Sequence, residues 1–94
     1  MKVKVRYFAY IRQLVQDTRE EEFSLPDRAT LRDLLMKIVK KYGRSIEKVL
    51  FDSMQKKALN ENIIVLVNGK AVNDLKLELE DEDTISIMPF LSGG

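Results

Sequence analysis

The chain has 94 residues, of which 45% are hydrophobic and 33% charged, and it contains neither cysteine nor histidine. This length suits one small domain with its own core. The missing residue types exclude disulfide scaffolds, zinc–cysteine and iron–sulfur sites, thiol catalysis and histidine-based triads. The net charge is +1, but the charges are unevenly distributed along the chain. Residues 1–60 carry 14 basic and 8 acidic side chains, and residues 61–94 carry 2 basic and 7 acidic side chains. We therefore expect a dipolar surface that orients a docking partner.

Neither a membrane span nor a signal peptide is apparent in the sequence. The longest apolar run, residues 63–67, is far below the roughly 20 residues that a span requires, and the N-terminus lacks the apolar stretch and cleavage site of a secretion signal. We expect a cytoplasmic protein without membrane contacts. No repeat or linker divides the chain, so the predicted organisation is one domain, residues 1–89, followed by a flexible tail, residues 90–94.

The N-terminal part of the chain predicts two strands joined by a short connection. Residues 2–8 alternate charged and apolar side chains, which is the pattern of a half-buried strand. Residues 10–15 have the composition of a short helical turn. Residues 17–21 are entirely polar and fit a hairpin loop, so that the second strand covers residues 22–25 and stops at Pro26.

A helix that begins after Thr30 is the clearest element. One apolar stripe with helical spacing is formed by Leu31, Leu34, Leu35, Ile38, Val39 and Tyr42. Thr30 is a good N-cap, Asp33 suits the positive end of the helix dipole, and Gly43 provides a stop. Residues 44–57 have weaker helical spacing, so that either a short second helix or a turn follows.

A hairpin is predicted in the second half of the chain. Residues 63–67 are an unbroken, β-branched apolar run, which is typical of a central strand buried on both faces. Asn68-Gly69 predicts a tight turn into a brief strand at residues 71–72. Residues 75–80 alternate leucine with charged residues, and they fit either a strand or an irregular loop.

The last predicted elements are a turn at residues 81–83 and a strand at residues 84–88 that ends at Pro89. Two strands, a helix and further strands form an α+β order. We expect the β-grasp, in which the first and last strands lie parallel at the centre of a mixed sheet. One main helix then crosses one face of that sheet.

The C-terminal residues Ser92, Gly93 and Gly94 carry no bulky side chain, and one interpretation is a frayed end without function. The apolar Phe90 and Leu91 directly after the last strand argue against it. Glycines without Cβ atoms can thread a narrow channel, and residues 90–94 reach roughly 16–18 Å when extended. Because the chain has no base, nucleophile or phosphate loop of its own, we expect a separate enzyme to activate the Gly94 carboxylate as an acyl-adenylate.

Four segments match motifs of a known family. Residues 5–14, VRYFAYIRQL, carry a strand followed by the pattern F-A-x-x-R-x-L, and residues 30–35 carry its helix start. Residues 67–69 carry its V-N-G hairpin, and residues 81–89 with the terminal Gly93-Gly94 match its ending. On these residues the whole chain resembles the MoaD/ThiS family of ubiquitin-like sulfur carriers, most closely the MoaD branch, the small subunit of molybdopterin synthase. The family's Pro-Pro is Pro89-Phe90 here, and its D-G-D turn is Asp81-Glu82-Asp83.

The resemblance implies that a ubiquitin-activating-type adenylyltransferase uses ATP to adenylate Gly94, and that a sulfur donor converts the adenylate to a thiocarboxylate. It implies no cofactor bound to this chain. The implied acceptor is molybdopterin, formed in the large synthase subunit into which the tail, with Gly93 and Ser92, inserts. Sulfur transfer to thiamine or tRNA remains open, as does use as a modifier conjugated to lysines of target proteins.

The resemblance also implies a partner-binding surface made of Phe8, Arg12, Met88, Pro89, Phe90 and Leu91. From the residues alone, Phe8 and Met88 fit a core equally well, and Arg12 fits a solvated helix. The acidic run at residues 78–83 lacks EF-hand spacing, and we expect no metal site. The basic excess of residues 30–57 lacks an aromatic platform for RNA, and we expect no nucleic-acid partner.

Overall fold

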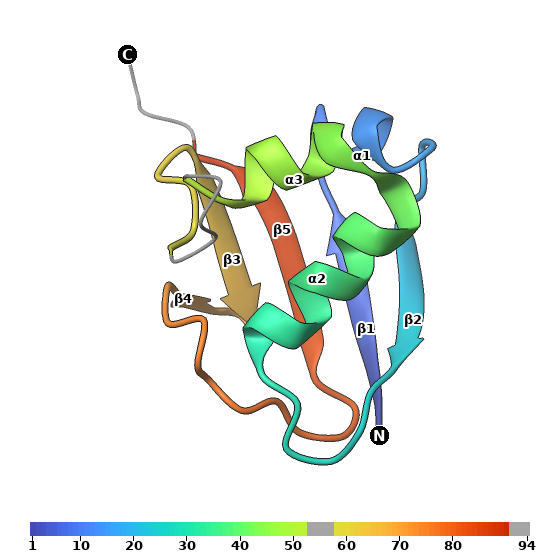
Figure 1. The fold of residues 1–94 in the computed structure, drawn as a ribbon, viewed down its shortest axis with the longest axis vertical. Helices are drawn as coiled ribbons and strands as arrows, with labels where there is room; N and C mark the ends of the chain where they lie inside the picture. The colour runs from blue at the N-terminus through green and yellow to red at the C-terminus, as the bar shows by residue number, and fades with distance from the viewer. Residues whose placement is uncertain (53–57, 91–94) are drawn as a thin grey trace.

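The computed structural model describes residues 1–52 and 58–90, and five strands in it form one mixed sheet. The elements in chain order are β1 (Lys2–Tyr7), α1 (Ile11–Leu14), β2 (Glu20–Ser24), α2 (Leu31–Tyr42), α3 (Arg44–Leu50), β3 (Ile63–Val67), β4 (Lys70–Val72) and β5 (Thr84–Pro89). The strand order is β2-β1-β5-β3-β4. Only β1 and β5 pair in parallel, and the helices lie on one face of the sheet (Figure 1). The predicted β-grasp is confirmed, with β5 at its centre.

Helix α2 forms by the local signals that predicted it. Thr30 Oγ1 accepts a hydrogen bond from the Asp33 backbone N–H, and Asp33 Oδ2 accepts one from the Thr30 N–H, so the helix begins with a capping box. Gly43 ends the helix with φ of 101°. Four residues of the apolar stripe are fully buried, namely Leu31, Leu34, Leu35 and Ile38. They pack with inward-facing strand residues to form the core.

The connection after α2 is helical, because α3 covers residues 44–50, and the remainder of the predicted segment lies partly outside the described residues. In the part of the chain that the structure describes, no helix is long and apolar enough to cross a membrane.

Strand β3 differs from its prediction. Ile63 and Val65 are buried, whereas Ile64 and Leu66 are only half-buried. The strand is one position from the sheet edge, since β4 lies outside it. The prediction of a central strand buried on both faces was wrong, because the helices cover one face of the sheet and leave the other face open.

The turns around β4 and β5 are held by side chains. Asn68 and Gly69 have φ of 52° and 88°, so the predicted tight hairpin is confirmed. Asp83 Oδ1 accepts a hydrogen bond from Asn68 Nδ2 at 2.7 Å, and Asp83 Oδ2 accepts one from the Glu80 N–H at 2.7 Å. Residues 75–80 form a loop with a single bridge, from Glu78 to residue 30. Among the described residues, no group of acidic side chains is arranged to hold a metal ion.

Candidate functional site

The sheet face that carries no helix is called the open face here (Figure 1). Alternate residues of each strand point to it, because their neighbours are buried under the helices. The open face is formed by Glu20 and Glu22 from β2, Lys4 and Arg6 from β1, Thr84, Ser86 and Met88 from β5, and Ile64 and Leu66 from β3. Charge therefore lies on the β1–β2 half of this face, and apolar side chains lie on the β3–β5 half.

An apolar row crosses three strands at the C-terminal end of β5. Tyr7 is in register with Ile87, and the Phe8 N–H donates to the Ile87 carbonyl at 3.1 Å, so the next pair along places Phe8 beside Met88. On the other side of β5, Met88 pairs with Ile64. All three members of the row are half-buried. Phe8 and Met88 are thus surface residues of the open face and not core residues.

We call Phe8, Met88, Ile64 and Leu66 the apolar patch. Leu66 extends the row along β3, where it pairs with Ser86. The helices lie on the other face of the sheet (Figure 1), and all four side chains remain partly exposed. An apolar surface of this kind on a small domain commonly marks a place where another protein docks.

Two arginines flank Phe8. The Arg6 guanidinium carbon lies 5.4 Å from the centre of the Phe8 ring, and that of Arg12 lies 5.8 Å from it. Both are within the range of cation–π attraction. Arg12 Nε also donates to the Tyr7 carbonyl at 2.9 Å, which fixes this half-buried side chain at the end of β1. The structure therefore places Arg12 beside Phe8.

The root of the predicted tail is part of the sheet. Pro89 pairs with Ile63, on the helix-covered side, so it does not join Phe8 and Met88. The Phe90 N–H donates to the Asn62 carbonyl at 2.8 Å, while the Phe90 side chain is 53% exposed. The backbone is therefore held through residue 90, one residue beyond the predicted domain end. The predicted site residues Leu91, Ser92, Gly93 and Gly94 lie outside the described residues.

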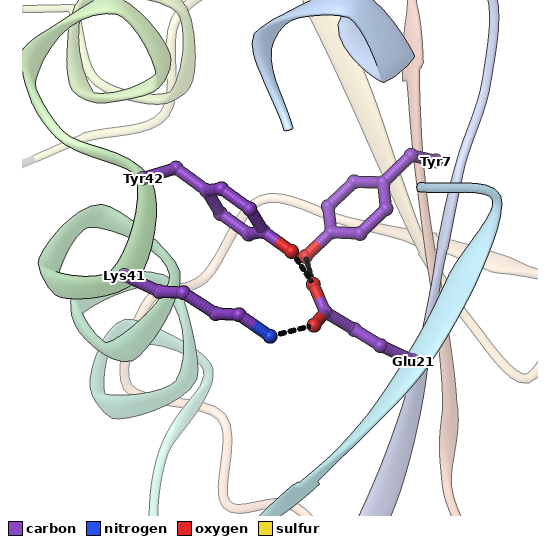
Figure 2. A network of polar contacts seen from close by, with 4 residues as sticks. All are labelled: Tyr7, Glu21, Lys41 and Tyr42. Atoms are coloured by element: carbon purple, nitrogen blue, oxygen red, sulfur yellow. Dashed lines mark hydrogen bonds and ion pairs between the residues drawn. The ribbon is translucent and has the colours of Figure 1, made fainter. Parts of the chain in front are cut away.

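A polar network on the helix-covered side of the sheet ties β1, β2 and α2 together (Figure 2). Tyr7, on the covered side of β1, and Tyr42 of α2 each donate a hydrogen bond of 2.7 Å to Glu21 Oε2. Lys41 Nζ donates to Glu21 Oε1. Strand β2 thus begins at Glu20, inside the predicted hairpin loop, because the polar residue Glu21 is turned inward and bound there.

The network lowers the pKa of Glu21 and raises the pKa values of Tyr7 and Lys41, that of Lys41 through its hydrogen bond to Glu21. Burial raises the pKa of the Glu21 carboxyl, but hydrogen bonds from Lys41, Tyr42 and Tyr7 outweigh it and lower that pKa below its ordinary value. Burial, followed by the hydrogen bond to Glu21, raises the pKa of Tyr7 far above its ordinary value. Glu21 is therefore a carboxylate, and the phenol is its donor.

The sequence prediction missed three residues of the site, namely Arg6, Ile64 and Leu66. Alternation along β1 could have placed Arg6 on the same face as Phe8. In β3 the uniform apolar run hid the alternation that separates Ile64 and Leu66 from their buried neighbours. A separate hollow of about 580 Å³ at the opposite end of the open face is lined by side chains of both charges and does not reach the patch.

Comparison with protein-family models gives a match to the ThiS family over residues 5–94. Comparison with curated protein sequences finds no match. Among solved structures, molybdopterin converting factor subunit 1 from Pyrococcus furiosus is 34% identical, with 97% of this chain and 99% of that chain covered and a TM-score of 0.78. Small archaeal modifier protein 1 from Methanosarcina acetivorans is 31% identical, with 99% and 96% covered and a TM-score of 0.78. SAMP1 from Haloferax volcanii, 24% identical over 100% of both chains with a TM-score of 0.84, shares the fold.

Proposed function

This chain belongs to the ThiS family of ubiquitin-like sulfur carriers and modifiers, and on that premise we propose that it carries sulfur as a thiocarboxylate at Gly94 for molybdopterin synthesis. The observation that carries the proposal is the apolar patch, which lies at the end of β5 from which the tail continues. A partner that covers Phe8 and Met88 has the tail within reach of its own active site. The folded domain then provides the binding surface, and the residues beyond Phe90 enter the partner.

The proposed chemistry needs only the C-terminal carboxylate from this chain. An oxygen of the Gly94 carboxylate attacks the α-phosphorus of ATP bound to the activating enzyme, which forms an acyl-adenylate and releases pyrophosphate. A hydrosulfide equivalent from the sulfur donor then attacks the acyl carbon and expels AMP, which leaves the thiocarboxylate. In transfer, this sulfur attacks an electrophilic carbon of the acceptor and displaces an oxygen leaving group from that carbon. Water then attacks the acyl carbon and breaks the acyl–sulfur bond, so that the acceptor keeps the sulfur as a thiol and the chain regains its carboxylate.

The choice of molybdopterin as the acceptor is supported by the similarity to the Pyrococcus furiosus protein. We propose the large subunit of a molybdopterin synthase as the second partner, since it would bind the apolar patch and receive the tail. The matched relative and this chain cover each other almost completely.

The proposed sulfur carriage is tested by intact-mass measurement. The chain is incubated with the activating-type enzyme of the same genome, ATP and a sulfide donor, and we expect one oxygen to be replaced by sulfur in the C-terminal peptide. A variant lacking Gly94 is the matched control, and it should remain unmodified while still binding the enzyme through the patch. A wild-type chain that keeps its carboxylate under these conditions would show that sulfur carriage is wrong.

Conjugation to lysines is the second candidate function, because the similarity to the Methanosarcina acetivorans modifier protein is nearly as high. Both functions begin with the same adenylate, and they differ in whether sulfur or a lysine amine attacks it. A proteome search for lysines that carry a remnant of the Gly93-Gly94 tail separates them. Finding such lysines in cells, and losing them on deletion of Gly94, would establish the modifier role.

A further inference from the structure

Arg6 does not form the ion pair that its position in the sheet offers. Its cross-strand neighbour is Glu20, and opposite charges in such pairs usually attract. The Glu20 carboxylate instead lies 3.6 Å from Lys4 Nζ, and the Arg6 guanidinium lies over the Phe8 ring. Arg6 is therefore directed along the strand toward the apolar patch.

The same ring has Arg12 as its second neighbour, so two guanidinium groups gather around one aromatic side chain. Within residues 1–52 and 58–90, neither of them forms an ion pair with a carboxylate. Arg12 is held in place by its hydrogen bond to the Tyr7 carbonyl. The edge of the patch thus carries two positive charges that the described part of the chain does not neutralise.

Docking of a partner on the apolar patch would change the surroundings of these charges. A protein that covers Phe8 and Met88 also removes water from the guanidinium groups beside them. Burying a charge without a counter-charge is costly, whereas a well-placed carboxylate compensates for the lost water. A partner that binds tightly must therefore bring its own acidic side chain to this position.

We propose that Arg6 and Arg12 together select partners that present an Asp or Glu side chain next to the apolar group covering Phe8 and Met88. The proposal deepens the proposed function, on which it rests, by stating the chemistry of the docking partner. A nucleic acid fits the surface less well, because Glu20 and Glu22 lie on the same open face directly beside the β1 cations and repel a long polyanion. A single carboxylate avoids that repulsion.

Arg6→Gln tests the proposal, and Lys2→Gln is the matched control, because Lys2 lies on the same strand and face but pairs across the sheet with Ser24 and not with Glu20. Binding of each variant to the activating-type enzyme of the same genome is measured by biolayer interferometry at low and high salt. We expect Arg6→Gln to weaken binding about tenfold or more and to reduce the salt dependence, with Lys2→Gln close to wild type. Arg12→Gln should behave like Arg6→Gln, and circular dichroism checks that it folds without the bond to Tyr7.

Charge reversal identifies the partner's group. Arg6→Glu should abolish binding, and changing the contacting Asp or Glu of the enzyme to Arg should restore it. Equal affinities for Arg6→Gln and Lys2→Gln would overturn the proposal. So would a mobility-shift assay in which a transfer RNA binds the wild type and no longer binds Arg6→Gln. If the wild type neither binds the enzyme nor acquires sulfur, the proposed function fails. If it acquires sulfur while Arg6→Gln binds equally well, only the selection by Arg6 fails.

Discussion

Replacing Glu21 with glutamine tests whether its carboxylate holds β2 against α2 (Figure 2). Only 12% of the side chain is exposed, and it accepts hydrogen bonds from two phenols and an ammonium group. Glutamine keeps the shape but loses the charge, and it replaces one acceptor oxygen with an NH2 donor. Since a hydrogen bond to a charged group contributes about 1.5–3 kcal/mol, we expect the free energy of unfolding to fall by about 2–3 kcal/mol. For a domain of this size, Tm should fall by roughly 10–20 °C.

The measurement is a urea titration followed by circular dichroism, with Glu22→Gln as the matched control. Glu22 is the next residue of β2 and points to the exposed open face, so its substitution should change the free energy of unfolding by less than about 0.5 kcal/mol. Equal losses for the two variants would refute the reasoning, because the effect would then come from net charge or strand propensity. It would not come from the hydrogen bonds to Glu21.

The pH dependence gives an independent check on the same carboxylate. Its pKa in the folded protein is lowered from an ordinary value of 4.5. A group whose pKa is lowered by folding adds stability above its unfolded pKa, and this contribution disappears as the pH falls through its folded pKa. The stability difference between wild type and Glu21→Gln should therefore be constant above about pH 5 and shrink under acidic conditions.

Three further predictions follow from single contacts. Met88→Glu should weaken binding to the large synthase subunit by about 2 kcal/mol or more while the domain stays folded, since Met88 lies on the open face. Calorimetric titration measures this loss of affinity, and Thr84→Glu, on the same strand and face, is the control. Glu82 has a φ of 68° where the resembled family has glycine, so Glu82→Gly should stabilise the domain by up to about 1 kcal/mol in thermal unfolding. Glu82→Ala, which removes the carboxylate but keeps a Cβ atom at this φ, should not. Asp83→Asn should lower the free energy of unfolding by about 1–3 kcal/mol in the same assay. Both oxygens of Asp83 accept hydrogen bonds, from Asn68 Nδ2 and from the Glu80 N–H, whereas asparagine has one acceptor oxygen and would turn its NH2 group toward one of these donors.

The parts of the fold that depend on neighbouring residues could be predicted from the sequence. Helix α2 has its cap, apolar stripe and stop within residues 30–43, and the Asn68-Gly69 turn fixes its hairpin locally. The start of β2 could not be predicted in this way. Glu21 resembles a loop residue until Tyr7 and Tyr42, which are 14 and 21 residues away in the chain, bring their hydroxyls to it.

The candidate site was predicted only in part, for a similar reason. Phe8, Arg12 and Met88 came from the family motifs. The strand register explains why Phe8 and Met88 meet, and the hydrogen bond to the Tyr7 carbonyl explains the place of Arg12. Arg6 belongs to no motif, and its place in the site depends on Glu20 pairing with Lys4. Glu20 can form an ion pair with Lys4 or with Arg6, and strand alternation alone does not predict which of the two forms in the folded protein.

The central position of β5 has a mechanical consequence for a domain that is held by its tail. This strand is bonded on one side to β1 and on the other to β3. Tension applied beyond Phe90 acts along both ladders at once, in shear, so their hydrogen bonds must break together. A tail attached to an edge strand such as β4 would detach from the sheet one bond at a time. Thermal motion of a large partner that grips the tail should therefore leave this domain folded.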